Sequence, residues 1–394
     1  MKVDFKNQSV LFTFDQVMDS GLIFLFIALG GVLLSKIDMA TVVLAQSTAL
    51  VCVLFCSCFT TQYLLLKYKK QNIEYWMALF GFFYIITLVL IFFILQSPQI
   101  ILLFTVGIVS EFLKRYCYYY ELSLMSFLSS MTTVVLFCIT MIFTYAGYAP
   151  LSSDFYIYYY AGAKLMPLII VVIAITVKNR KCQLMAEKNN VFHAIKDSLK
   201  CGMVFAIITI IYWTTNQGFF ILLQDKIVPG DLVEIRITQN VFGVVTMLIT
   251  LYDSIFLKKN INNDKKIFNR VAYLKFAFVA SVLIAVNYIF LYILSLTMYN
   301  GIDVLKYSIY LALAQWFFIL SRMPILILKL RYNLNVVLLV YGFSLIVSGA
   351  YLYININSTT YFYIVEAIAL ANFLTFAFSS LIVVIKESDY GKVN

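Results

Sequence analysis

One stretch of the sequence decides the fold: residues 219–259, FFILLQDKIVPGDLVEIRITQNVFGVVTMLITLYDSIFLKK. Two apolar segments flank a polar turn, and this pattern predicts a hairpin of two membrane helices. A similar hairpin occurs near the N-terminus, and the matching residues are Lys36 with Lys226, Asp38 with Asp231 and Gln46 with Gln239. Either the chain is a degenerate repeat of about half its length, as in many transporters, or the two hairpins are unrelated.

The composition excludes a soluble globular domain. Of 394 residues, 63% are hydrophobic and 12% are charged, and the mean hydropathy is +0.92, whereas a soluble domain is about half apolar. The apolar runs last about twenty residues, which suits a membrane-crossing helix rather than the shorter alternating strand of a barrel. Because residues 1–19 are polar, we expect the first helix to be kept rather than cleaved as a signal peptide.

The apolar runs predict an all-α polytopic membrane protein with twelve transmembrane helices. These lie near residues 11–36, 39–66, 75–96, 98–118, 122–147, 155–177, 200–224, 231–257, 271–297, 303–329, 333–355 and 360–385. We expect one six-helix lobe at 1–181 and a second at 182–394, which begins with an interlobe linker at about 182–199. The loops are short and leave no room for an extramembrane catalytic domain.

Lysine and arginine are concentrated in alternate connections, and this asymmetry predicts the orientation. The other connections hold little more than Lys36, Lys226 and Lys306. By the positive-inside rule, both termini are expected to be cytoplasmic. The net charge of +10 is spread over many short loops, so a nucleic-acid partner is not expected.

Metal and covalent chemistry have little support in the sequence. The seven cysteines lie in predicted spans or on the predicted cytoplasmic side, and the single histidine, His193, lies in a cytoplasmic connection. We therefore expect no metal, no cofactor, no catalytic residue and no enzymatic activity.

A lysine is expected close to the bilayer midplane in the sixth span. A charge there costs about 2.5–3.5 kcal/mol on insertion scales, so Lys164 is interpreted as a binding residue. Pro167 follows three residues later and predicts a kink. The tenth span has a similar pair, Arg322 and Pro324, although Arg322 is near enough to the cytoplasmic end to reach the membrane surface.

The seventh and eighth spans carry polar side chains. Asn216 and Gln217 lie mid-span and need partners, which either neighbouring helices or a wet cavity would supply. In the eighth span, Arg236 and Asn240 share one face, with Gln239 beside them. Together with Lys164 and Arg322, these residues predict a positively charged cavity between the lobes that suits an anionic headgroup.

Three carboxylates within the spans are candidates for a proton or sodium site: Asp15, Glu234 and Glu366. Nothing in their spacing selects one. Asp15 and Asp19 are explained more simply by contact with headgroups and water near a helix end. Glu234 is either an ion-pair partner of Arg236 or part of the substrate site.

Two further patterns are typical of helix packing and membrane interfaces. The tyrosines within 116–120 and 156–160 are interpreted as interfacial belts. Small residues recur along the fifth span and would let helices approach closely; they are Ser123, Ser126, Ser130 and Thr133.

Two motifs carry a resemblance to a known family. EFLKR at 111–115, with the tyrosines and serine-rich span that follow, and RITQNVFG at 236–243 resemble the Wzx-type polysaccharide and O-antigen flippases of the multidrug/oligosaccharidyl-lipid/polysaccharide exporter superfamily. The twelve-span plan with cytoplasmic ends is similar too. The chain departs from the family pattern at 253–255, where it has Asp-Ser-Ile in place of a frequent proline.

The resemblance implies two six-helix bundles related by a pseudo-twofold axis, a V-shaped cavity and alternating access. It implies that an undecaprenyl-diphosphate-linked oligosaccharide moves from the cytoplasmic to the periplasmic leaflet of a bacterial inner membrane. Membrane lipid and the glycosyltransferases or polymerase of the same pathway are the expected partners.

Roles for the candidate residues follow from that substrate. Lys164 and Arg236 would hold the diphosphate with Arg322 opposite, and the amides would bind sugar hydroxyls; these amides are Asn216, Gln217, Gln239 and Asn240. Three alternatives stay open: a cation-coupled drug or small-molecule antiporter on the same scaffold, a membrane polysaccharide polymerase or ligase, and a non-transporting partner of glycosyltransferases.

Overall fold

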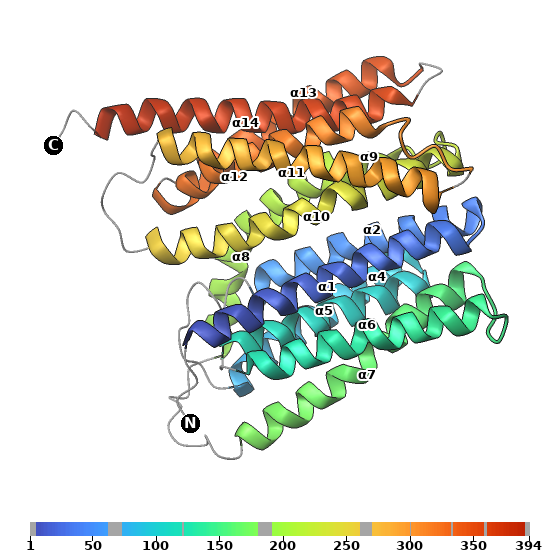
Figure 1. Cartoon of the computed structure of the whole chain (residues 1–394). Coiled ribbons are helices and arrows are strands. Elements are labelled where there is room, and N and C mark those ends of the chain that lie inside the picture. The colour runs from blue at the N-terminus through green and yellow to red at the C-terminus, as the bar shows by residue number, and fades with distance from the viewer. Residues whose placement is uncertain are drawn as a thin grey trace. The chain divides into compact units, whose positions relative to one another are not determined.

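The computed structural model is helical along the residues it describes, which are 5–61, 73–119, 122–179, 191–260, 270–299, 301–331, 334–357 and 361–390, and these include no strand. The helices of the first half are α1 (Phe5–Leu33), α2 (Lys36–Phe59), α4 (Ile73–Leu95), α5 (Pro98–Tyr119), α6 (Ser123–Tyr145) and α7 (Ser153–Asn179) (Figure 1). Those that follow are α8 (Val191–Trp213), the π-helical turn η1 (Thr214–Gly218), α9 (Phe219–Leu222), α10 (Pro229–Asn260), α11 (Arg270–Thr297), α12 (Ser308–Arg331), α13 (Leu334–Asn355) and α14 (Phe362–Tyr390).

The predicted all-α membrane fold is confirmed. If α8, η1 and α9 are taken as one span, each of the twelve predicted spans corresponds to a described helix. Ten helical stretches in the described part of the chain are long and apolar enough to cross a membrane. α5 and α10 are not among these ten, and both carry charges, such as Lys114 and Arg115 on α5 and Glu234 and Arg236 on α10.

The tenth span begins later than predicted. The sequence predicted a helix from 303, but α12 begins at Ser308, and residues 301–307 form turns instead. These turns are fixed by bonds to α10, because the Asp303 N–H donates to Glu234 Oε1 (3.3 Å) and Thr238 Oγ1 donates to the Val304 carbonyl (2.7 Å). Val304 is therefore held against α10, although the segment that contains it is not helical.

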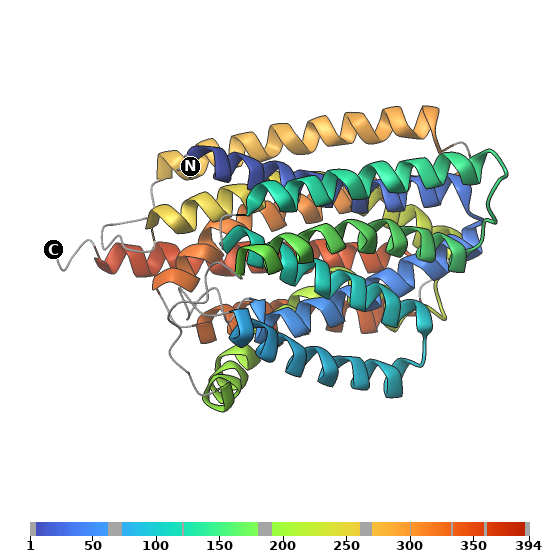
Figure 2. The ribbon, with the colours of Figure 1, turned by 90° about the horizontal axis from the view of Figure 1, so that it is seen from below.

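The chain forms two compact units, Met1–Ile210 and Ile211–Asn394. The predicted lobe boundary at 181 and the linker residues 182–190 lie outside the described residues. Residues 191–199, also predicted as linker, belong to α8, most of which groups with the first unit. Figure 2 shows the other helices of the first unit running side by side, with the first turns of α8 directed across them.

One helix of each unit has a corresponding set of neighbours. In the first unit α5 packs against α2, α4, α6 and α7, and in the second unit α12 packs against α10, α11, α13 and α14. If α8, η1 and α9 are counted as the first span of the second half, the fourth span of each half contacts the second, third, fifth and sixth. Asp38 and Asp231, which the repeat matches, both lie in the first turn of the unit's second helix. This correspondence supports an internal repeat over two unrelated hairpins.

An aromatic cluster fills the core of the first unit. The Phe26 ring lies 4.3 Å from the ring of Tyr160 and 5.0 Å from that of Tyr156, measured between centroids. The Tyr156 hydroxyl donates to the Phe26 carbonyl at 2.6 Å. Tyr156 and Tyr160 are thus buried rather than interfacial, as is Tyr116, whereas Tyr158 is exposed as a belt residue would be. Hydropathy alone does not distinguish a core tyrosine from an interfacial one.

Candidate functional site

Helix α1 carries two carboxylates into the first unit. Asp15 and Asp19 are four residues apart and therefore lie on one face of the helix. Asp15 is 1% exposed, whereas the Asp19 side chain is 25% exposed. The structure thus differs from the expectation that both acids reach headgroups and water: Asp15 lies inside the helix bundle, where a charge requires partners.

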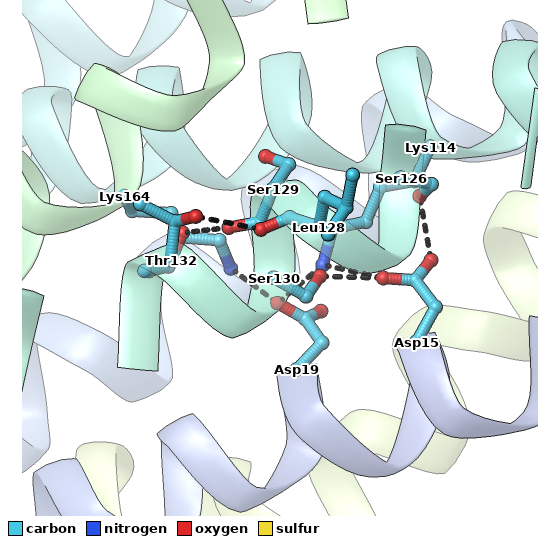
Figure 3. A network of polar contacts seen from close by, with 10 residues as sticks. Asp15, Asp19, Lys114, Ser126, Leu128, Ser129, Ser130, Thr132 and Lys164 are labelled. Atoms are coloured by element: carbon cyan, nitrogen blue, oxygen red, sulfur yellow. Dashed lines mark hydrogen bonds and ion pairs between the residues drawn. The ribbon is translucent and has the colours of Figure 1, made fainter. Parts of the chain in front are cut away.

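Serine hydroxyls from α6 supply those partners to Asp15. Ser126 Oγ donates to Asp15 Oδ2 at 2.6 Å, and Ser130 Oγ donates to Asp15 Oδ1 at 2.5 Å. Lys114 Nζ, from α5, lies 3.9 Å from Asp15 Oδ1. The serine stripe that was predicted to let helices pack closely also provides hydrogen-bond donors to a buried acid (Figure 3).

Asp19 bridges two lysines from different helices. Its Oδ1 atom lies 2.7 Å from Lys114 Nζ and 3.2 Å from Lys164 Nζ. Both lysines are buried, and the Lys164 ammonium also lies 5.8 Å from the centre of the Tyr160 ring. When all four groups are ionised, two aspartates and two lysines carry no net charge. Lys164 is therefore part of a charge-balanced cluster, and not a lone cation.

A second polar cluster lies in the second unit around the π-helical turn. Asn216 Nδ2 donates to the Tyr212 carbonyl at 2.9 Å, and Asn372 Nδ2, from α14, donates to Asn216 Oδ1 at 3.1 Å. Gln239 Nε2 donates to the Asn216 carbonyl at 3.2 Å, and Arg236 Nη1 donates to Gln239 Oε1 at 3.4 Å. The structure thus brings together three of the predicted residues, Arg236, Asn216 and Gln239.

Sequence reasoning missed one member of this cluster. Asn372 lies inside the apolar helix α14 and is 5% exposed. The rule that an amide in hydrocarbon needs a partner applies to it as it does to Asn216. The π-helical turn could not be read from the sequence, although such turns often mark functional positions.

The remaining predicted amides lie on the same two elements. Gln217 belongs to η1, and its buried Oε1 has no hydrogen-bond partner among the described residues. Asn240 lies on α10, one helical turn beyond Arg236. A buried amide oxygen without a partner is unusual in proteins, so the Gln217 oxygen is available as an acceptor.

The other predicted charges have separate surroundings. The Arg322 guanidinium stacks over the ring of Phe318, with 5.2 Å between its Cζ and the ring centre. Glu366 accepts a hydrogen bond of 2.5 Å from the Tyr351 hydroxyl. Glu234, as described above, accepts one from the Asp303 backbone, so its carboxylate helps to hold the turns before α12.

Asp231 ties the same turns to the start of α10. Lys306 Nζ lies 2.5 Å from Asp231 Oδ1, and the Tyr307 hydroxyl donates to that oxygen at 2.8 Å. The hydrogen bond to Asp231 raises the pKa of Lys306, and burial is the main cause that raises the pKa of Tyr307. We call Asp231, Lys306 and Tyr307 the loop clamp.

These helices have the twelve-helix fold that is seen in solved structures of MATE transporters. No protein-family model matches the sequence, and no curated protein matches it. The fold assignment therefore comes from solved structures.

Three solved structures illustrate the likeness. A multidrug resistance MATE family transporter of the MOP superfamily, in its outward-facing conformation, is 13% identical over 100% of this chain and 98% of its own, with a TM-score of 0.59. The MATE transporter VcmN of Vibrio cholerae, in its bent form, is 12% identical over 97% of each chain, with a TM-score of 0.59. The eukaryotic MATE transporter AtDTX14 is 11% identical over 96% of this chain and 94% of its own, with a TM-score of 0.52.

Proposed function

We propose that this chain is a flippase that works by alternating access. Its substrate would be an oligosaccharide linked to undecaprenyl diphosphate, moved from the cytoplasmic to the periplasmic leaflet of a bacterial inner membrane, with both termini cytoplasmic. The observation that carries the proposal is the polar cluster of Arg236, Gln239, Asn216 and Asn372, which lies within the helices of a transporter-type fold. Polar groups are costly in hydrocarbon and are typically retained there for substrate or ion pathways.

The chemistry of this cluster suits a glycan attached to an anion. Amides both donate and accept hydrogen bonds, as sugar hydroxyls do, and the unsatisfied Gln217 oxygen offers an acceptor. The guanidinium of Arg236 would bind a phosphate through charge-assisted hydrogen bonds, with Arg322 as a further cation in the same unit. Asn240 would add a sugar contact on α10. Translocation breaks no covalent bond, so the proposal requires neither a catalytic residue nor a cofactor.

Replacement of Arg236 tests the proposal. Reconstituted in proteoliposomes with a fluorescent undecaprenyl-diphosphate oligosaccharide, Arg236→Gln is expected to slow translocation about 10–100-fold, because one charge-assisted bond contributes about 1.5–3 kcal/mol. Lys226→Gln, an exposed cation in the turn before α10, is the matched control and should be unaffected. Wild-type protein that leaves the lipid in its original leaflet would refute the function, and an unaffected Arg236→Gln would refute the residue's role.

In cells, deletion of the gene separates this function from two of its rivals. Loss of a flippase strands lipid-linked units in the inner leaflet, where glycosyltransferases built them. Loss of a polymerase instead strands single units on the periplasmic side. Export that continues without the protein would favour a role as a non-transporting assembly partner.

A cation-coupled antiporter on the same scaffold is the second candidate, and the cluster on α1 favours it. A buried carboxylate such as Asp15 is a suitable site for a proton or a sodium ion if its partners rearrange. In that case Asp15→Asn would abolish drug efflux driven by a proton or sodium gradient. Oligosaccharide translocation that survives in Asp15→Asn, with no gradient-driven efflux in the wild type, would exclude this candidate.

A further inference from the structure

We infer that Asp19 is an internal stand-in for a phosphate: its Oδ1 fills a site for a phosphate oxygen formed by Lys114 and Lys164, and an incoming diphosphate replaces it. This inference rests on the proposed function, because it names where the anionic part of the substrate binds in the first unit. It also assigns a role to Asp19, which was expected only to contact headgroups and water, and to Lys114, which was named only as part of the EFLKR motif.

The geometry around Asp19 Oδ1 is that of an anion site. A single oxygen atom lies between two ammonium groups, at 2.7 Å and 3.2 Å, as Figure 3 shows from close by. Phosphate oxygens take the same charge-assisted contacts with lysine. The side chains of Lys114 and Lys164 are only 6% and 8% exposed, so water cannot solvate their charges and an anion must.

The two aspartates differ in how firmly they are held. Asp15 is fully buried and accepts hydrogen bonds from two serine hydroxyls. Asp19 is partly exposed, and its ion-pair partners within the described residues are the two lysines. Asp19 is therefore the acid that an outside anion can replace, while Asp15 remains in place beside Lys114.

The charges balance before and after the exchange. Two lysines and two aspartates sum to zero when Asp19 is in place. After Asp19 turns toward its exposed side, one phosphoryl group with a single negative charge restores that sum within the cluster. A sugar-linked prenyl diphosphate carries one such charge on each of its two phosphates, so one phosphate matches the site.

The test measures binding of inorganic diphosphate and of farnesyl diphosphate to the purified full chain in detergent. Asp19→Asn keeps the shape of the side chain and removes its charge, so it should bind both probes about tenfold more tightly than the wild type, or better. Glu111→Gln is the matched control, because Glu111 also pairs with a cation, with Arg115 Nε 2.8 Å from its Oε1. Removing the charge of Glu111 should leave the affinity for both probes unchanged. The double variant Asp19→Asn with Lys164→Gln restores the charge balance of the cluster, so it should lose the gain in affinity for both probes.

The outcomes are distinct. Unchanged or weaker binding by Asp19→Asn, or a gain that persists in the double variant, would overturn the inference. If Asp19→Asn is recovered folded only with diphosphate present, the exchange is supported; if diphosphate does not rescue it, the site does not accept the anion and the inference fails. Translocation by the wild type is a separate readout: if it is absent while Asp19→Asn gains affinity, the proposed function fails and the anion site stands.

Discussion

A carboxylate inside an apolar helix bundle needs donors, and Asp15 obtains them from side chains on two other helices. The sequence flagged Lys164 because a mid-span charge is costly, and it flagged Asp15 as an acid. It could not reveal the pairing, because Asp19 meets Lys164 across 145 positions of the chain. Local patterns show that a buried charge must be compensated, and only the folded chain shows by which residue.

Truncation of Asp15 is expected to destabilise the protein strongly. Asp15→Ala leaves Lys114 with less compensation and two buried serines without their acceptor, and breaking a buried pair typically costs about 3–5 kcal/mol. Thermal unfolding in detergent, followed by circular dichroism, measures the loss. Asp303→Ala, whose side chain is exposed, is the control. Equal unfolding temperatures for the two variants would contradict the assigned role of Asp15.

At the level of elements, helix identity was predictable and some helix ends were not. Runs of apolar residues fix where a chain crosses a membrane, and the described helices follow those runs. The predicted start of α12 was wrong because residues 301–307 are apolar enough to resemble part of a helix. In the structure, the polar groups of these residues form hydrogen bonds with α10 instead. Such non-local bonds leave no periodic signal.

Removal of the loop clamp should loosen residues 301–307 without unfolding the unit. Asp231→Asn weakens the contacts with Lys306 and Tyr307, so amide hydrogen exchange of this segment should accelerate several-fold, as expected for a partly exposed ion pair of about 1 kcal/mol or less. Asp225→Asn, an exposed acid in the preceding turn, is the control. Unchanged exchange in Asp231→Asn would show that Glu234 and Thr238 hold the turns alone.

The clamp also has a pH dependence with a definite sign. Because the pKa of Lys306 is raised, its contribution is fully present below the unfolded-state pKa of about 10.4 and is lost only as the pH rises through the higher folded-state value. The difference in intrinsic-rate-corrected exchange between Asp231→Asn and the wild type should therefore be the same at about pH 6 and about pH 8. A difference that vanishes within that range would contradict the pairing.

For the whole molecule, the repeat seen in a few matched residues extends to the packing. The same helix of each unit contacts the same four neighbours. The two buried polar clusters do not follow the repeat. The cluster in the first unit consists of paired aspartates and lysines, whereas the cluster around the π-helical turn of the second unit consists of amides and Arg236. Packing needs only apolar surfaces of the right shape, so it survives divergence that removes sequence identity, whereas the polar residues of each unit have specialised.

Labelling of single cysteines tests the predicted orientation. In a variant whose seven cysteines are replaced by alanine, Tyr148→Cys lies between α6 and α7 and is expected to react with a membrane-impermeant maleimide in cells with a permeabilised outer membrane. Phe192→Cys, at the start of α8, should react only after lysis. The native residues are 81% and 79% exposed, so access to either site depends on the side of the membrane. The reverse labelling would overturn cytoplasmic termini.

The central position of α12 has a consequence for biosynthesis. Most of its apolar surface is buried, chiefly against α14. Since a chain emerges from the ribosome N-terminus first, α12 is inserted before α13 and α14 exist to cover it. Translation must pass residue 390 before α12 is enclosed, so a nascent chain that stalls after α12 has left the ribosome, but before α14 is made, would leave this helix accessible to membrane proteases.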